Sequence, residues 1–518
     1  MSEEQTTFSQ FSYLLDSDNY VAITIKQSLA PANDSDPVIF PPSYPMAGLK
    51  GRVHTVRDGD YRVSVELPPD SKRDKSDKGA DQKPGYNLDR FPDGTSICEI
   101  DSPQSQANRI EPRVFKDLHP GLVPQIEIRV GSNGTTVNLL DAGHRAADAV
   151  VRMSSLADRF HSAFLDVKAG DHFALGTLAP TSLLFGVWDS RSTNVKVQRI
   201  LKAHIYASNV LERTRSAQFA PAADYVAAGA VDESLDSGEG DQNPLSSEGM
   251  KYALATQTAG GVMLTGTSEL TRTVALNLAA VRGLRGSDEP HTQALRSYVL
   301  GLALLAATSD PDLNLREGCN LRLKDAVDTT MLVPRRGAPE PVALDPGEVQ
   351  RFARLSAEAF FALAQIGFAE KDHLDAIFER DVAETFLGMG DDRDKVRKLG
   401  PITAATLKRF SELAKDPFKS VGDGLKAARA ALGKGPRKKQ SPVKNLEALK
   451  PLADAFKQMA ENASLSSEVT ALAADLAALA SEHGDSHATL RVIDKKLKEF
   501  RRDQKKAPEQ QPDDTPAE

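Results

Sequence analysis

Cysteine is scarce in this chain of 518 residues, which contains only Cys98 and Cys319. Two cysteines far apart and outside any CxxC motif can form neither a disulfide framework nor a cysteine-rich zinc site. Long apolar runs are absent too, because the longest, Val299 to Ala307, is far shorter than the ~20 residues that a membrane span needs. The opening MSEEQTTFSQ is acidic and polar, unlike a signal peptide. We expect a soluble protein of the reducing cytoplasm with no membrane partner.

An excess of positive charge is also missing, since the formal net charge is −8. This excludes a uniformly basic nucleic-acid-binding protein, although 64 lysines and arginines leave room for a local basic groove. The hydrolase motifs GxSxG and HExxH are absent, and the glycines of AGGVMLTGTSEL (259–270) lack the lysine of a phosphate-binding loop. We therefore expect a protein that is not an enzyme and needs no cofactor and no metal.

The patterns that are present indicate a mixed α and β protein. Apolar and polar residues alternate in YVAITIKQS (20–28), which is typical of a half-buried strand. Residues 143–165 have helical spacing, with an arginine every seven residues on one face. The run SLLFGVW (182–188) is predicted to be a buried strand. After about Val342, alanine-rich helical patterns replace the strands.

Segments of biased composition divide the chain. Residues 31–84 are poorly patterned and are predicted to form a flexible loop. The stretch Asp232 to Glu248 contains six carboxylates and no basic residue, and is predicted to be an exposed excursion from the fold. The predicted units are a strand-containing domain over 1–342, a helical extension over 343–433, a basic linker over 434–444, a small helical bundle over 445–506 and a disordered tail over 507–518.

The stretch IDSPQSQANRIE (100–111) gathers hydrogen-bonding side chains at a predicted strand-to-helix junction. Amides and a guanidinium at such a junction can contact phosphates and bases of single-stranded RNA. The residues concerned are Gln104, Gln106, Asn108 and Arg109. The same pattern is typical of a helix cap, with Ser102 or Ser105 satisfying free N–H groups, and spacing alone favours the cap.

Two further segments are open to two interpretations each. The arginines of 143–165 can follow a phosphate backbone, but Asp148 and Arg152 form an i,i+4 pair that suits a solvated helix face, which we favour. The stretch Trp188 to Arg215 holds six basic residues against two acids, with aromatic residues available for stacking. An exposed sheet edge protected by basic side chains explains that stretch equally well.

Several uncommon strings occur in order along the chain. They are GYNLDRFPDGTSICEIDSPQSQANRIE (85–111), LLDAGHRAADAVVR (139–152), LLFGVWDSR (183–191), VKVQRILKAHIYA (195–207) and LNLREGCNLRLK (313–324). Together they resemble the RAMP-type backbone subunit, of the Cas-seven type, from type I CRISPR interference complexes of subtype G, formerly U. The resemblance spans roughly Tyr20 to Lys324. It implies an α+β fold with a ferredoxin-like, RRM-related palm carrying insertions, to which this chain adds an all-α C-terminal extension.

The resemblance also implies a role in antiviral defence. The expected partners are a guide CRISPR RNA, further copies of the chain along that RNA, other effector subunits of a Cascade-like complex, and target DNA reached through the guide. Matching the strings residue by residue places RNA contact at Gln104, Gln106, Asn108, Arg109, His144, Arg145, Arg191, Lys196 and Arg199. A thumb that separates stretches of guide is expected at about 224–249, with Gly85 to Phe91 as the second candidate.

The helical extension departs from the resemblance. Helical small subunits line related complexes, so we hypothesise that the extension holds displaced DNA through the basic stretches 434–444 and 495–506. Two alternatives to the guide-binding role stay open. One is a general single-stranded RNA-binding protein, and the other is a RAMP ribonuclease that uses Asp101 or His144.

Overall fold

The structure is a computed structural model of the chain. The described residues are 11–45, 84–131, 134–238, 243–325, 328–365, 374–415, 421–432, 449–461, 467–481 and 485–504. Most of the predicted flexible loop (31–84), the whole basic linker (434–444) and the predicted tail (507–518) lie outside them.

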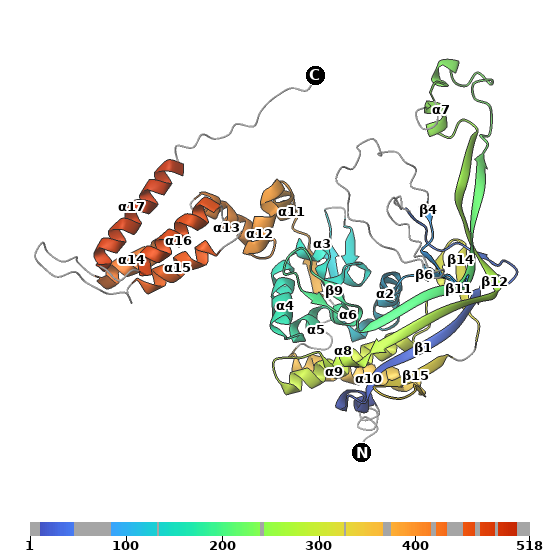
Figure 1. The fold of residues 1–518 in the computed structure, drawn as a ribbon, viewed down its shortest axis with the longest axis horizontal. Coiled ribbons are helices and arrows are strands. Elements are labelled where there is room, and N and C mark those ends of the chain that lie inside the picture. Colours follow the sequence, from blue (N-terminus) through green and yellow to red (C-terminus); the bar gives the residue numbers. More distant parts are fainter. Residues whose placement is uncertain are drawn as a thin grey trace, which may run out of the picture.

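Four antiparallel strands form the centre of the palm, the part of the structure between residues 11 and 378 (Figure 1). They are β1 (Tyr20–Pro31), β11 (Leu201–Phe219), β12 (Ala253–Asn277) and β15 (Thr329–Pro334), in the order β15-β1-β12-β11. Helices connect β1 to β11, and α9 (Glu289–Thr308) lies between β12 and β15. This is the β-α-β-β-α-β order of ferredoxin-like folds, so the predicted α+β fold class is confirmed.

Shorter strands extend this sheet and form small additional ones. Beside the central strands lie β2 (Val38–Ile39), β5 (Leu88–Arg90), β6 (Ser96–Asp101), β13 (Asn314–Arg316), β14 (Cys319–Leu323) and β16 (Glu340–Pro341). The other sheets are β7 (Ile126–Arg129) with β8 (Thr136–Asn138) and β17 (Leu374–Ile377), β9 (Val187–Trp188) with β10 (Lys196–Val197), and β3 (Tyr44–Pro45) with β4 (Pro84–Gly85).

Alternation along β1 decides which face of the sheet the helices cover. Ile23, Ile25 and Leu29 are buried, whereas Lys26 between them is exposed. Each such aliphatic side chain contributes roughly 1.5–3 kcal/mol when it is buried rather than exposed. The apolar helix α9 is buried from Tyr298 to Ala307, as expected of a helix that is apolar on all sides.

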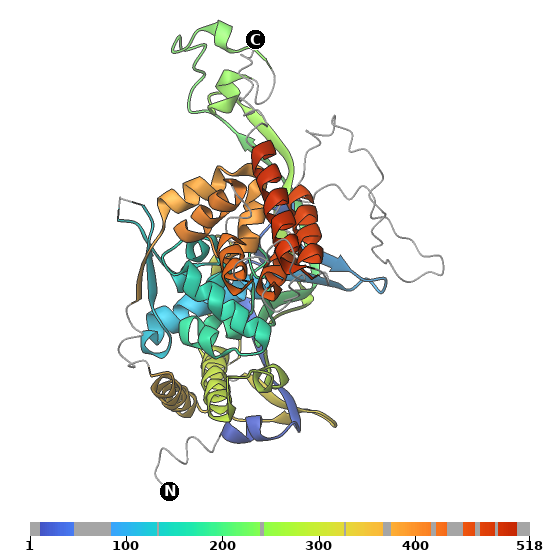
Figure 2. The same ribbon diagram turned by 90° about the vertical axis from the view of Figure 1, so that its left-hand side faces the viewer.

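The strands β11 and β12 continue beyond the sheet as a two-stranded arm, which projects from the palm in both views (Figures 1 and 2). They pair as far as Phe219 and Ala253, with register shifts along the way. The predicted thumb (224–249) lies at the tip of this arm, together with α7 (Pro244–Ser247). The second candidate, Gly85 to Phe91, lies instead along the sheet edge that contains β5.

Helices pack against the buried face of the sheet. They are α2 (Pro103–Pro112), α3 (Ala149–Arg152), α4 (Ala157–Ala169), α5 (Phe173–Leu178), α6 (Pro180–Phe185), α8 (Leu278–Arg282), α9 and α10 (Pro346–Leu363), and most of them contribute to one core. Two expectations are wrong here. Most of the predicted strand 182–188 is the end of α6, and the predicted helix 143–165 is broken, because Asp148 caps α3 and Ser154 forms a β-bridge with Phe378.

The predicted boundary at residue 342 does not match the edge of the core. Phe352, Phe360 and Phe361 of α10 are buried in the core of the palm. Farther along the chain, β17 pairs in parallel with β7. The palm therefore extends to about residue 378.

Two helical units follow the palm. The first consists of α11 (Arg380–Leu387), α12 (Arg393–Leu399) and α13 (Ala404–Lys415), whose apolar residues pack around Met153 of the palm. The second is a bundle with its own core, built from α14 (Gly422–Leu432), α15 (Lys450–Ala460), α16 (Ser467–Ser481) and α17 (Ser486–Gln504). The bundle thus begins before the predicted residue 445. None of the described helices is both long and apolar enough to cross a membrane.

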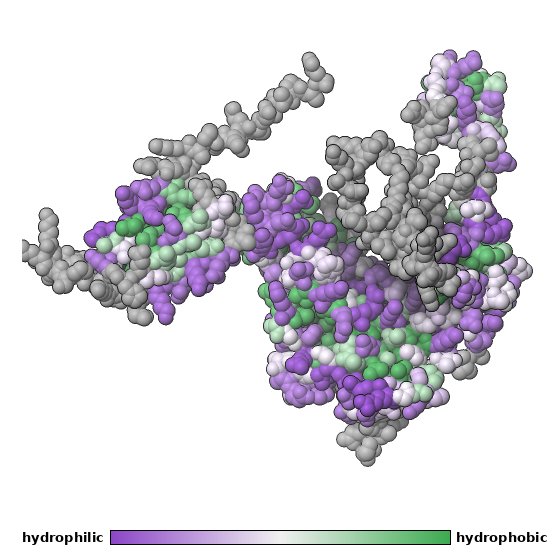
Figure 3. All heavy atoms as spheres, viewed as in Figure 1, coloured by the Kyte–Doolittle hydropathy of each residue, from purple (hydrophilic) through white to green (hydrophobic). Residues whose placement is uncertain are grey.

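The surfaces of the two helical units differ in the view of Figure 3. Hydrophilic side chains dominate over α11 and α12, whereas the visible face of the bundle mixes hydrophilic and apolar side chains. The unit next to the palm therefore presents the more polar surface on this side.

Candidate nucleic-acid interface

The predicted strand-to-helix junction is the passage from β6 into α2. Ser102 is the N-cap residue, and its hydroxyl accepts a hydrogen bond from the Ser105 backbone N–H at 3.2 Å. Pro103 follows at the first helical position, where its missing N–H is not needed. The capping role expected of Ser102 is confirmed. A rigid helix start then holds the polar side chains of α2 in place.

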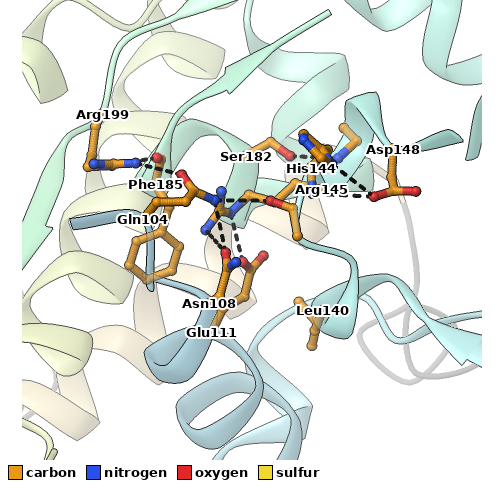
Figure 4. Close-up of polar contacts among 12 residues, drawn as sticks. Gln104, Asn108, Glu111, Leu140, His144, Arg145, Asp148, Ser182, Phe185 and Arg199 are labelled. Atoms are coloured by element: carbon orange, nitrogen blue, oxygen red, sulfur yellow. Dashed lines mark hydrogen bonds and ion pairs between the residues drawn. The ribbon is translucent and has the colours of Figure 1, made fainter. Parts of the chain in front are cut away.

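An outer network joins α2 to two other segments of the chain (Figure 4). The Gln104 amide donates to Asn108 Oδ1 at 3.0 Å and to the Gly143 carbonyl at 3.1 Å. Arg199 donates to Gln104 Oε1 at 2.9 Å and to the Phe185 carbonyl at 2.9 Å. Gln104 and Asn108 are exposed, so this network presents amides and a guanidinium to solvent.

Arg145 holds the outer network from inside the protein. Its side chain is 3% exposed, its Nε lies 2.7 Å from Glu111 Oε2, and its guanidinium lies over the Phe185 ring. Its backbone has a φ of 51°, a left-handed conformation uncommon for a residue other than glycine. Burial raises the pKa of Glu111 to about 7, against the opposing effect of the Arg145 charge. Arg145 therefore positions the loop and is not on the surface, contrary to its predicted contact with RNA.

His144 lies beside Arg145 but points the other way. Its side chain is 86% exposed, and its Nδ1 is 3.5 Å from Asp148 Oδ2. Asp148 also accepts from the backbone N–H of Val150 and so caps α3. The structure thus places His144 on the surface, next to a carboxylate that has a structural task.

Arg199 is the partly buried cation of the outer network. Burial lowers the pKa of Arg199, and the nearby Arg145 charge lowers it further. An anion close to Arg199 would stabilise its charged form, because the anion offsets both the burial and the repulsion from Arg145.

An inner network occupies the interface between α2 and the sheet. Gln106 donates to Asp101 Oδ2 at 2.6 Å and accepts from Arg272 Nε at 2.9 Å, while Arg272 also donates to Gln27. Gln106 is 1% exposed and both ends of its amide are occupied. Gln106 is thus an interior residue, and its amide has no free end for the predicted contact with RNA.

Arg109 is held between the two networks and the strand β13. Its Nη2 donates to the Leu315 carbonyl at 2.6 Å, and its Nε lies 3.4 Å from Asp101 Oδ2. Only part of the guanidinium is open to solvent. The structure leaves Arg109 less available to a ligand than its sequence position suggests.

Arg191 and Lys196 belong to the hairpin formed by β9 and β10. Both side chains are exposed, and Lys196 lies over the ring of Trp188. Arg199 follows the same hairpin, so these three cations lie on one short segment. The hydrogen bond from Arg199 to Gln104 joins that segment to the outer network.

The predicted arginine stripe of 143–165 does not form a continuous surface. Arg145 is buried, Arg152 is partly buried, and Arg159 is exposed on α4. Burial lowers the pKa of Arg152, and the charges of Arg397 and Arg191 lower it further, whereas Asp189 opposes them. Arg397 belongs to α12, so a basic residue of the helical extension lies near the basic residues of the palm.

The prediction missed Glu111 and Arg272, which hold the two networks. Nothing in the local pattern indicates that Glu111 is buried. Arg272, by contrast, lies two residues from each of the buried Leu270 and Val274 on β12, so the three side chains share one face of the strand. An arginine at an inward position of a strand is a signal of a buried polar network.

The described ranges contain no group of three or more His, Cys, Asp or Glu side chains placed to hold a metal. The exposed side chains at this site are the amides of Gln104 and Asn108, the imidazole of His144 and the cations of Arg191 and Lys196. Such side chains suit phosphate oxygens and base edges.

Comparison with known families bears on this site. Residues 23–212 match the family model described as CRISPR-associated protein GSU0053 (Cas_GSU0053). The matched segment runs from β1 into β11 and includes every predicted site residue. This match confirms the resemblance to a CRISPR-associated subunit of the Cas-seven type. No curated protein matches the chain.

Proposed function

We propose that this CRISPR-associated chain is a non-catalytic, guide-RNA-binding backbone subunit of a Cascade-like effector complex of type I, subtype G. Several copies would line one guide RNA, and pairing between the guide and invading DNA would supply sequence specificity. The observation that carries the proposal is the outer network. It lies within the family-matched segment and joins exposed amides to the partly buried Arg199, which follows the hairpin that carries the exposed Arg191 and Lys196.

The geometry of the site supports a division of roles among its residues. Arg199, Lys196 and Arg191 supply positive charge for phosphates, while Gln104 and Asn108 supply amides for sugar or base contacts. Arg145 and Glu111 keep the loop that carries His144 in register with α2. A site of this composition holds the RNA backbone and leaves bases free to pair with a target.

The arm is the element that we propose as the thumb. Its tip, residues 220–252, contains seven carboxylates and one lysine, which would repel phosphates. We therefore propose that the tip contacts protein of the neighbouring copy, while the shaft of the arm passes the RNA. Arg213 on the shaft is exposed and gives it positive charge.

The helical extension is proposed to hold displaced target DNA, as a small subunit would. Lys495 and Lys498 of α17 are exposed and Lys496 is partly exposed, but all three lie near carboxylates of the same bundle. Exposed pairs of this kind contribute about 0–1 kcal/mol, so exchanging a carboxylate for a phosphate costs little.

The proposal is tested by reversing three charges together, the exposed Arg191 and Lys196 and the partly buried Arg199, as Arg191→Glu, Lys196→Glu and Arg199→Glu. We expect the purified protein to lose its copurifying RNA, and the salt dependence of binding to fall by roughly one unit of slope per lost phosphate contact. Lys26→Glu, on the opposite face of the sheet and 55% exposed, is the matched control. Sequencing of the RNA from the unaltered protein should return short RNAs with a common repeat-derived end.

Two outcomes contradict the proposal. Unchanged RNA content in the triple variant would show that the outer network is not the guide site. Equal affinity for unrelated RNA at matched salt would favour a general RNA-binding protein instead.

The ribonuclease alternative has less support from the geometry. Asp101 is buried and hydrogen-bonded to Gln106, whereas His144 points to solvent from another segment. Incubating the purified protein with guide and target RNA tests it. Cleavage that disappears in His144→Ala would replace the non-catalytic proposal.

A further inference from the structure

Trp188 is the only tryptophan of the chain, and it is 58% exposed. It lies on β9, within the segment that carries Arg191, Lys196 and Arg199. The exposed indole ring offers a flat apolar surface, and the cations around it attract negative charge. A flat, negatively charged ligand would contact both.

The hairpin holds Trp188 on a rigid base. β9 and β10 pair Trp188 with Lys196 and Val187 with Val197. In the turn, the buried Asp189 accepts from the backbone N–H and the hydroxyl of Thr193, both at 2.8 Å. A platform held in this way loses little conformational entropy when a ligand binds.

Two neighbours orient the indole. The Lys196 ammonium lies 5.6 Å from the ring centroid, within the range of a cation–π contact. The indole N–H points to Asn194 Oδ1 at 3.4 Å. The ring is thereby fixed with an amino group over it, while more than half of the side chain remains open.

Cations and amides continue around the hairpin. Toward α2, Arg199 joins the hairpin to Gln104 of the outer network. The hairpin also borders a hollow of about 540 Å³ whose lining residues include Lys168, Lys196 and Gln198. A strand bound across Trp188 thus has cationic residues close to it.

From this arrangement we propose that Trp188 is a stacking platform for one unpaired base of bound single-stranded RNA, and that Lys196 contacts the phosphate next to that base. Aromatic stacking accepts every base, because each has a π-face, and so suits guides of any sequence. The inference rests on the proposed function and adds to it a base contact of defined position.

A protein partner fits this surface less well. Arg191, Lys196 and Lys168 would repel a basic surface, and an acidic one would leave the indole without a flat partner. A nucleotide supplies the flat ring and the negative charge in one ligand.

The test uses the fluorescence of the full chain, in which the whole tryptophan signal comes from Trp188. We expect an unstructured RNA of mixed sequence to quench this emission, and inorganic polyphosphate, which carries charge but no base, to leave it nearly unchanged. In anisotropy measurements with labelled RNA, Trp188→Ala should weaken binding about 5- to 150-fold, the range for loss of one base stack. Trp188→Phe should retain most of the affinity. Lys196→Gln should lower the salt slope, which Trp188→Ala should not.

The outcomes separate this inference from the proposed function. If RNA binds by anisotropy but leaves the emission unchanged, and Trp188→Ala binds equally well with an unchanged melting curve, the stacking site is refuted and guide binding stands. If the unaltered protein binds no RNA, both fail. If the emission shifts with protein concentration in the absence of RNA, and Trp188→Ala abolishes self-association, the surface is a protein contact and the inference is overturned.

Discussion

At the scale of single residues, the pair formed by Arg145 and Glu111 is the most consequential feature of the site. The two charges are buried together at 2.7 Å, beneath side chains that face solvent. Removing one member of a buried ion pair costs about 3–5 kcal/mol, because it leaves the other charge unpaired. The effect of mutating either residue therefore depends on whether Glu111 is protonated.

We predict that Arg145→Gln destabilises the protein more at pH 8 than at pH 5. Burial already raises the folded-state pKa of Glu111 above its unfolded value, and loss of the arginine raises it further. The folded state then binds the proton more tightly, so the stability that this proton provides is complete below the unfolded pKa and is lost as pH rises through the folded pKa. Urea unfolding at the two pH values measures the difference.

The double variant Arg145→Gln with Glu111→Gln is the control for this prediction. It removes the titrating group, so the extra loss at pH 8 should disappear. An equal loss at both pH values in the single variant would show that Arg145 acts through packing on Phe185 alone.

At the scale of elements, the arm separates cleanly from the sheet that carries it. The register of β1 with β12 and the lower part of β11 does not depend on residues beyond Phe219 and Ala253. The acidic tip can therefore be removed without touching the outer network.

We predict that replacing residues 220–252 with Asn-Gly leaves the fold and single-copy RNA binding intact but weakens association between copies. Asn-Gly forms the tight turn that matches strand twist and can join Phe219 to Ala253. Sedimentation of the protein with a guide-length RNA measures the assembly. Changing Asp232 and Glu233 to their amides should weaken it partly, and full-length assemblies from the tip-deleted protein would contradict the role of the arm.

At the scale of the whole molecule, the two helical units differ in their dependence on the palm. The unit of α11 to α13 packs around Met153, whereas the bundle of α14 to α17 has a separate core. A truncated chain should therefore end between these two cores, and not at the residue where the composition of the chain changes.

We predict that a chain ending at residue 415 folds and binds guide RNA but is impaired in holding open a target DNA duplex. Melting curves, RNA binding and a strand-displacement assay measure the three properties. A chain ending at residue 342 should fail to fold, because it lacks the buried Phe360 and Phe361 of α10 and the strand β17. Unchanged strand displacement in the chain ending at 415 would remove the bundle from the proposed mechanism.

The sequence by itself determined the fold class, the inward residues of β1, the burial of α9 and the family resemblance, since alternation, helical spacing and uncommon strings are local properties. It misassigned α6 because a short apolar run suits a buried helix as well as a buried strand. It placed the boundary at residue 342 because composition changes there, whereas the core does not end.

Only the tertiary structure decided which polar residues of the site face solvent. Gln104 and Gln106 are two positions apart on one helix, yet Gln104 meets Arg199, 95 residues away, at the surface, and Gln106 meets Arg272, 166 residues away, in the interior. Arg145 and His144 are adjacent and point to opposite environments. Burial and hydrogen bonding depend on contacts between segments distant in sequence, and a polar side chain has the same local pattern in either place.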